Sequence, residues 1–317
     1  MTNVTTFSKI VQRVVEESSK VLVDRSSYVE LITFSIIFEG HVLIEGIPGI
    51  AKTLTAKTIA RLLNLSFSRI QCTVDILPSD IIGTRIFNQK TGEFELRLGP
   101  IHSNVVLVDE INRASPRAQS ALLEAMQERQ VTIDGETIKL PRPFIVIATQ
   151  NPIELEGTFP LPEAQLDRFY IKINMSPLER TSLIKLLKKD LRAIEREFEN
   201  LRPVVGREDL EEASKEIEQV YIDDSIYDYV ARIAEYSNRH PAVRLGITPR
   251  GALMLVNLAK EFALYERRKY VIPDDVKKAS LPALSHRILL KPEYIAGEYN
   301  VERIIQEILA KVEVPRP

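Results

Sequence analysis

A series of short apolar stretches constrains the fold of this chain more than any other feature. They cover residues 41–45, 66–71, 104–110, 144–149 and 168–173, and helical patterns lie between several of them. Stretches that are apolar on nearly every residue are typical of strands buried on both faces of a parallel sheet. Their alternation with helices indicates an α/β domain. We therefore predict a parallel sheet covered by helices on both faces.

Two segments break this alternation, and both have the pattern of a β-hairpin. Residues 84–98 alternate apolar and polar side chains around a turn at residues 90–92, and residues 131–138 contain Asp134-Gly135. An Asp-Gly pair suits a two-residue turn that needs positive φ. We predict both hairpins as insertions in the α/β core. Their pattern alone favours decorative edge hairpins.

Helical patterns dominate the two ends of the chain. Residues 7–22 and 26–38 are predicted to be helices, and the first is amphipathic, unlike a signal peptide. After Pro177 strand patterns vanish, and helical patterns rich in Lys, Arg and Glu continue almost to the end. We therefore predict an α/β domain over residues 1–175 and an all-helical domain over residues 176–317.

Composition excludes several classes of protein. The single cysteine, Cys72, rules out an intrachain disulfide. No apolar run approaches the roughly 18 residues that a membrane span needs, so we expect no membrane span and a cytoplasmic location. The net charge is −2, which argues against a dedicated nucleic-acid binder. The histidines show no metal-binding spacing and are interpreted as structural: His41, His102, His240 and His286.

Residues 46–53, GIPGIAKT, nearly match the phosphate-binding pattern G-x-x-x-x-G-K-[ST], with Ala51 in place of the second glycine. They follow a predicted strand and precede a predicted helix, which is the context that such a loop requires. Backbone N–H groups and the helix N-terminus would face an anion there. In this pattern Lys52 reaches the phosphates and the Thr53 hydroxyl helps hold Mg²⁺. We predict negative φ at Ala51, with its N–H directed at the phosphates.

Asp109 and Glu110 end the apolar strand over residues 104–110. Adjacent carboxylates in this place can divide their roles, one holding Mg²⁺ and the other acting as general base for a water. Taken alone, the pair favours an ordinary strand that runs into an acidic turn. The phosphate loop upstream favours the catalytic interpretation.

Three further polar residues occupy suggestive places. Asn151 follows an apolar strand and could orient a water, although Asn151-Pro152 is also a plain turn signal. Arg168 precedes the last strand and could equally form a surface ion pair. Arg250 would be the second residue of a helix capped by Thr248. A cation there faces the positive end of the helix dipole, which makes sense if it serves an anion.

The stretches GIPGIAKT, VVLVDEINRASPRAQSALLEAMQER, IATQNPIELEGTFPLPEAQLDRF and LGITPRGAL resemble, in this order, a MoxR-type AAA+ ATPase. The resemblance covers nearly the whole chain. It implies a P-loop core with a five-stranded parallel sheet, two hairpin insertions and an all-helical lid domain. Members of the family often carry alanine before the lysine. The chain departs from common family residues at Val74, Thr248 and Gly251.

The resemblance also implies a role for each matching residue. Glu110 would activate water, Asn151 would match sensor 1, and Arg250 would match sensor 2. Arg168 would be an arginine finger that acts on the ATP of a neighbouring subunit. Thr53 and Asp109 would hold Mg²⁺. The residues implied to contact ATP are Gly46, Pro48, Gly49, Ile50, Ala51, Lys52, Thr53, Leu54 and Asp109.

The implied function is Mg²⁺-dependent ATP hydrolysis in a ring, usually of six subunits. It would drive chaperone-like remodelling or maturation of a partner, with a von Willebrand factor A domain protein or a client enzyme complex as the expected partner. A ring motor acting on nucleic acid and a nucleotide-gated scaffold with little turnover are the alternatives. Residues 80–83 fit the short D-x-x-G pattern of GTPases. A GTPase is nevertheless disfavoured, because the sequence has no Asn-Lys-x-Asp element for guanine recognition.

Overall fold

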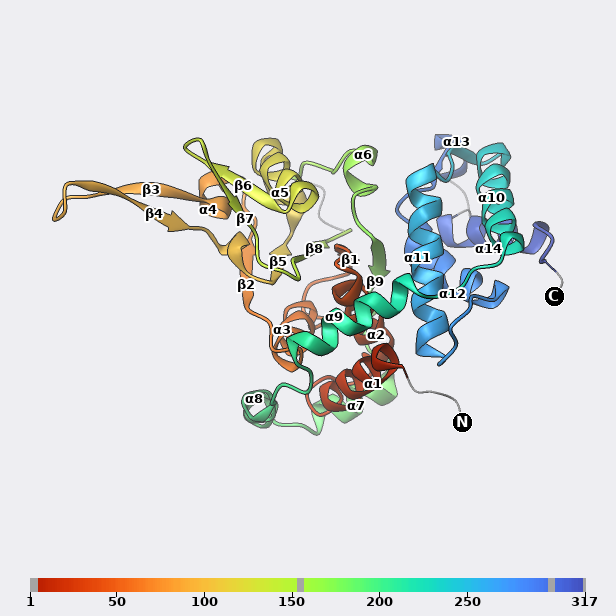
Figure 1. Cartoon of the computed structure of the whole chain (residues 1–317), viewed down its shortest axis with the longest axis horizontal. Coiled ribbons are helices and arrows are strands. Elements are labelled where there is room, and N and C mark those ends of the chain that lie inside the picture. The colour runs from red at the N-terminus through yellow and green to blue at the C-terminus, as the bar shows by residue number, and fades with distance from the viewer. Residues whose placement is uncertain (1–4, 153–156, 296–299, 316–317) are drawn as a thin grey trace. The chain divides into compact units, whose positions relative to one another are not determined.

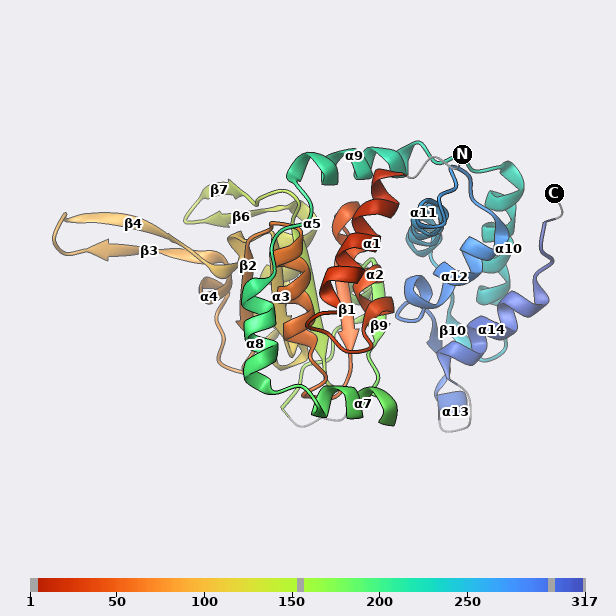
Figure 2. The same ribbon diagram turned by 90° about the horizontal axis from the view of Figure 1, so that it is seen from below.

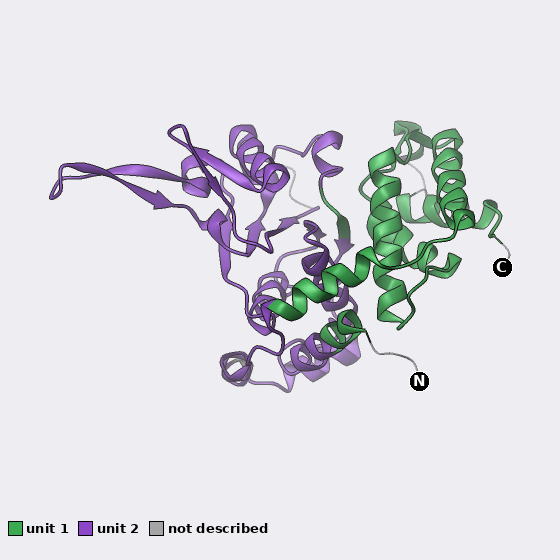
Figure 3. Cartoon of the chain, in the orientation of Figure 1, with its two compact units in different colours: residues 1–12, 169–172, 208–317 green, residues 13–168, 173–207 purple. Residues whose placement is uncertain are grey.

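The computed structural model describes residues 5–152, 157–295 and 300–315. The chain forms two compact units (Figure 3). Unit 1 comprises Met1–Gln12, Phe169–Lys172 and Glu208–Pro317, and unit 2 comprises Arg13–Arg168 and Ile173–Arg207. Residues 173–207 thus group with the α/β unit, whereas the division into domains at residue 175 stays a prediction.

A five-stranded sheet forms the centre of the α/β fold (Figure 1). Its strand order is β2-β5-β8-β1-β9, and the pairs β2–β5, β5–β8 and β1–β8 are parallel. Every residue of β5 is buried, as expected for a central strand with both faces covered. The predicted parallel sheet is confirmed, and its strands are β1 (Val42–Glu45), β2 (Phe67–Gln71), β5 (Val105–Asp109), β8 (Ile145–Gln150) and β9 (Ile171–Asn174).

Helices cover this sheet, and α3 contacts β2 and β5 directly (Figure 2). Helix α1 ends at Ser18, earlier than the sequence pattern predicts, whereas α2 begins and ends as predicted. The helices up to residue 207 are α1 (Thr6–Ser18), α2 (Ser26–Phe38), α3 (Lys52–Leu62), α4 (Pro78–Ile82), η1 (Pro100–His102), η2 (Ile111–Arg113), α5 (Pro116–Glu128), α6 (Glu163–Leu166), α7 (Arg180–Leu187) and α8 (Leu191–Asn200).

Both predicted hairpins are present. The first joins β3 (Gly83–Asn88) to β4 (Glu93–Leu98) and projects away from the sheet in both views (Figures 1 and 2). The second joins β6 (Gln130–Ile133) to β7 (Glu136–Lys139). Its turn has positive φ at Asp134 (49°) and Gly135 (83°), which confirms the turn predicted from that pair.

Unit 1 is mainly helical, as predicted, but also holds a short antiparallel strand pair that the sequence did not reveal. The Thr248 hydroxyl accepts a hydrogen bond from the Gly251 N–H (3.1 Å), which confirms the predicted cap of α11. The elements are α9 (Arg207–Glu218), α10 (Asp224–Arg239), β10 (Val243–Leu245), α11 (Pro249–Tyr265), α12 (Pro273–Leu284), β11 (Leu289–Leu290), α13 (Pro292–Ile295) and α14 (Val301–Lys311).

A buried guanidinium holds residues 169–172 within unit 1. Arg287 is only 4% exposed and donates hydrogen bonds to the carbonyls of Phe169 (2.6 Å) and Tyr170 (3.1 Å). A Cβ at Gly251 would lie 2.9 Å from Cδ of Arg287, so the missing side chain there makes room for this arginine. The departure at Gly251 therefore has a packing reason. Among the described residues, no helix combines the length and apolarity needed to cross a bilayer.

Candidate nucleotide site

The phosphate loop connects the end of β1 to the start of α3. Gly46 is required by close packing, because a Cβ there would lie 2.5 Å from Cδ1 of Ile50 and 2.8 Å from the Met175 carbonyl oxygen. Gly49 has φ of 82°, a left-handed conformation that glycine adopts without strain. The first half of the loop therefore has glycine where the backbone requires it.

The conformation of Ala51 contradicts the negative φ predicted from the sequence. Its φ is 70° and its ψ is 25°, so it lies in the left-handed region, not at negative φ. The prediction was wrong because α3 begins one residue later than assumed, at Lys52, and Ala51 is its N-cap. A left-handed alanine costs about 1–2 kcal/mol relative to right-handed backbone. Position 51 thus has the left-handed backbone that suits the glycine of the pattern, but it is occupied by an alanine, which is strained there.

We expect Ala51→Gly to raise the free energy of unfolding by about 0.5–1 kcal/mol, since relief of strain exceeds the entropy that glycine adds to the unfolded chain. Denaturant-induced unfolding measures this. Ala121→Gly, within helix α5, is the matched control and should lower stability by about 1 kcal/mol. Equal destabilisation by the two substitutions would contradict the strain at Ala51.

Lys52 is the first residue of α3, and its ammonium group lies beside the loop. Its Nζ donates to the carbonyl oxygen of Gly46 (2.7 Å). Burial lowers the pKa of Lys52, and the nearby charges of Asp109 and Glu110 act in the opposite direction. A partly desolvated cation that spans the loop in this way is placed to exchange a carbonyl for a phosphate oxygen.

Asp109 ends β5 and is held by three side chains. Its Oδ1 accepts a hydrogen bond from the Thr149 hydroxyl (3.0 Å). Its Oδ2 lies 3.4 Å from the Thr53 hydroxyl and 2.7 Å from Nε of Arg69. The structure thus brings the hydroxyl and the carboxylate predicted to hold Mg²⁺ to the same place.

Glu110 follows directly, in a left-handed conformation with φ of 57°. Its backbone N–H donates to the Thr149 hydroxyl (3.0 Å), and its Oε2 pairs with Nη1 of Arg113 (3.1 Å). Left-handed backbone at a residue other than glycine is a strained geometry that clusters at functional sites. The turn directs the two adjacent carboxylates to different partners, which is what separate roles require.

The other predicted site residues lie in different surroundings. Asn151 is buried (6% exposed) just after β8, whose register places that strand beside β5. Arg168 donates to the carbonyl oxygen of Leu123 in α5 (3.0 Å). Arg250 is exposed in the first turn of α11, which belongs to unit 1. The structure therefore gathers the loop and the two acids, and the roles of Asn151, Arg168 and Arg250 stay predictions.

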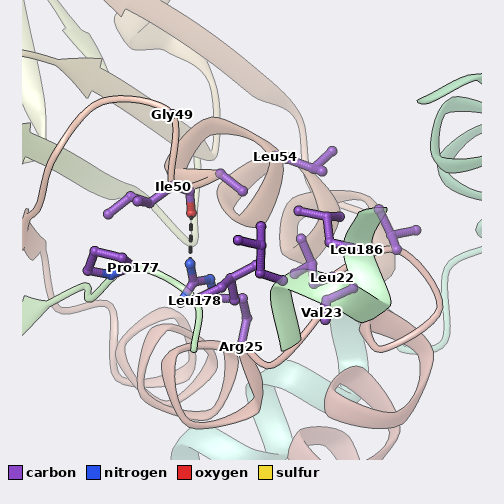
Figure 4. Close-up of a pocket in the computed structure, with 12 residues that line it drawn as sticks. Leu22, Val23, Arg25, Gly49, Ile50, Leu54, Pro177, Leu178 and Leu186 are labelled. Carbon is purple, nitrogen blue, oxygen red and sulfur yellow. Dashed lines mark hydrogen bonds between the residues drawn. The ribbon is translucent and has the colours of Figure 1, made fainter. Parts of the chain in front are cut away.

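An apolar pocket of about 240 Å³ adjoins the phosphate loop within unit 2 (Figure 4). The buried guanidinium of Arg25 donates to the carbonyl oxygens of Ile50 (3.4 Å) and Ser176 (3.0 Å), tying the loop to the segment after β9. The lining is mostly aliphatic: Val21, Leu22, Val23, Arg25, Gly49, Ile50, Ala51, Leu54, Pro177, Leu178, Leu183 and Leu186. Such a pocket suits a flat, weakly polar ring next to a bound phosphate chain.

The oxygen ligands fit Mg²⁺ held together with phosphate. Among the described residues, no group of three or more His, Cys, Asp or Glu is placed to hold a metal alone. Mg²⁺ is ordinarily held by one or two protein oxygens plus phosphates and waters, which matches Thr53 and Asp109. Nearby, burial, with the charges of Asp109 and Glu110, raises the pKa of the Cys72 thiol to about 12.

Comparison with known proteins agrees with this geometry. Residues 41–171 match the ATPase family associated with various cellular activities (AAA), and residues 235–308 match the AAA lid domain. The chain is 44% identical to the uncharacterised protein YeaC of Bacillus subtilis, over 96% of this chain and 94% of that protein. It is 40% identical to Chaperone MoxR1 of Mycobacterium tuberculosis, over 96% of this chain and 82% of that protein.

A solved structure of a similar protein has the same fold. The crystal structure of a putative ATPase from Cytophaga hutchinsonii superposes with a TM-score of 0.88 at 38% identity, covering 98% of this chain and 96% of that one. A phosphate loop after β1, paired acids at the end of β5 and an AAA lid define an AAA+ ATPase. Within that class, the chain belongs to the MoxR family.

Several residues of the site were not predicted from the sequence. Arg113 lies three residues after Glu110, a spacing that could have revealed it. Thr149 lies one residue before the end of β8, and Asp109 ends β5. The ends of parallel strands meet at one edge of a sheet, which is also a usable signal. Gly49, Ile50, Ala51 and Leu54 of the pocket lining were among the predicted ATP contacts, whereas Arg69 and the rest of the lining carry no local pattern that points to them.

Proposed function

We propose that this ATPase hydrolyses Mg²⁺-bound ATP at the subunit interfaces of a six-membered ring and uses the cycle to remodel a partner protein complex. The observation that supports hydrolysis best is the gathering of Lys52, Thr53, Asp109 and Glu110 at one edge of the sheet. A scaffold with little turnover would need the loop, but not a carboxylate base.

Each residue has a distinct task in the proposed reaction. Lys52 exchanges the Gly46 carbonyl for the β- and γ-phosphates, and the adenine ring lies in the pocket of Figure 4. Glu110 accepts a proton from the attacking water, and Asn151 orients that water. Bound Mg²⁺, held by Thr53 and Asp109, supplies charge neutralisation of the phosphates.

Two arginines complete the proposed site. Arg250 of the lid stabilises charge on the nucleotide of its own subunit. Arg168 does so on the nucleotide of the neighbour, and an arginine supplied in this way accelerates phosphoryl transfer only when subunits are docked. We therefore propose that the isolated subunit hydrolyses ATP poorly.

The proposed output is remodelling of a client. A relative carries the name Chaperone MoxR1, which supports a chaperone-like action for this chain. We propose a von Willebrand factor A domain protein or a client enzyme complex as the partner, on the strength of the family membership. Capturing partners with the Glu110→Gln variant in ATP tests this, and capture that is equal without nucleotide speaks against it.

Lys52→Ala tests the phosphate loop itself. Removing the ammonium group deletes charge-assisted hydrogen bonds to phosphate, so ATP affinity should fall on the order of a hundredfold. Isothermal titration with ATP and Mg²⁺ measures it. Lys57→Ala is the control, because Lys57 lies in the same helix but over the Phe198 ring. Equal ATP binding by both variants would remove the basis of the proposed site.

A further inference from the structure

The carboxylate of Asp109 forms an ion pair with the guanidinium of Arg69. Nε of Arg69 lies 2.7 Å from Asp109 Oδ2, and Nη2 of the same guanidinium donates to Oε1 of Gln71 (2.6 Å). The Asp109 side chain is 9% exposed, whereas that of Arg69 is 49% exposed. A nearly buried acid is thus neutralised by an arginine that remains free to reorient into solvent.

Arg69 pairs with the same oxygen of Asp109 that faces Thr53, the other proposed metal ligand. Oδ2 is also the atom that lies 3.4 Å from the Thr53 hydroxyl. A divalent cation held between Thr53 and Asp109 would stand within a few ångströms of the guanidinium, and like charges at that distance repel strongly in a partly buried site. The Arg69–Asp109 pair and a metal on Oδ2 therefore compete.

We propose that Arg69 is a specificity-determining residue that makes metal binding at Asp109 depend on bound nucleotide. Without nucleotide, the guanidinium neutralises Asp109 and excludes a divalent cation. With nucleotide, the phosphates hold the metal and also attract the released guanidinium, so the exchange becomes favourable. This inference rests on the proposed function, because it takes the phosphate loop as an ATP–Mg²⁺ site.

The test measures how ADP binding depends on Mg²⁺ in the full chain. Arg69→Gln and Arg69→Met both remove the competing cation, so the Mg²⁺ concentration at half-maximal ADP binding should fall on the order of tenfold. Arg69→Lys keeps the charge and should stay close to the wild type. Arg97→Gln, an equal charge change on the exposed strand β4, is the control. Unchanged or higher Mg²⁺ midpoints in the two neutral variants overturn the proposal.

Thermal unfolding gives a second readout that needs no turnover. In EDTA without nucleotide, Arg69→Gln leaves Asp109 unpaired and should lower the melting temperature. Mg²⁺ and ADP together should then raise the melting temperature more in the variant than in the wild type. An equal rise in both proteins contradicts the competition. Loss of the proposed function itself would appear differently, as ATP binding that survives in Lys52→Ala.

Discussion

Glu110→Gln is expected to lower the rate of ATP hydrolysis by about 10²–10⁴-fold while ATP still binds. The amide keeps the shape of the side chain but cannot accept a proton from water. The Glu110 backbone N–H is held by the Thr149 hydroxyl, so the substitution leaves the turn in place. Steady-state phosphate release and equilibrium ATP binding, measured on the same preparation, separate the two effects.

The matched control for this prediction is Glu124→Gln. Glu124 is exposed on α5 and is close to Glu110 in the chain, so the change in charge and the chemistry are the same. Turnover of Glu124→Gln should equal that of the wild type. If Glu110→Gln lost less than about tenfold in turnover, Glu110 would not be the general base.

Arg113 bears on the proposed role of Glu110 as general base, because the two side chains form an ion pair. Its guanidinium pairs with Glu110 Oε2 (3.1 Å), so one oxygen of the proposed base already accepts a charged hydrogen bond. The proposed base must therefore use its other oxygen or give up this hydrogen bond, which a sequence pattern does not express.

The fold was largely predictable because its signals are local. Apolar runs specify the parallel strands, Asp134-Gly135 specifies a hairpin turn, and Thr248-Pro249 specifies a helix start. Each of these depends on neighbouring residues only, and each is confirmed. The short β10–β11 pair was missed because two or three residues of strand leave no periodicity to detect.

The site was less predictable, for two physical reasons. The conformation of Ala51 depends on where α3 begins, and a loop pattern does not fix a helix boundary to one residue. Arg69 meets Asp109 only through the β2–β5 register, which pairs Gln71 with Asp109 and leaves Arg69 two residues earlier on the same face. Contacts made by strand register between distant segments have no signature in either segment alone.

Arg168→Ala is expected to lower turnover by about 10³–10⁵-fold in assembled rings, with ATP binding retained. In this chain Arg168 donates to the carbonyl oxygen of Leu123, so the side chain is held at a defined place by its own subunit. Arg192→Ala, which removes an exposed arginine from α8, is the control and should hydrolyse ATP normally. Turnover and ring assembly are measured together, because loss of assembly alone would also stop hydrolysis.

Mixing two inactive variants decides whether Arg168 acts across the interface. A Lys52→Ala subunit lacks its own site but still offers Arg168, whereas an Arg168→Ala subunit has an intact site and lacks the arginine. In randomly mixed rings, about one interface in four combines an intact site with a neighbour that supplies the arginine, so activity should return. If Arg168 served the site of its own subunit, no interface would be complete and the mixture would stay inactive.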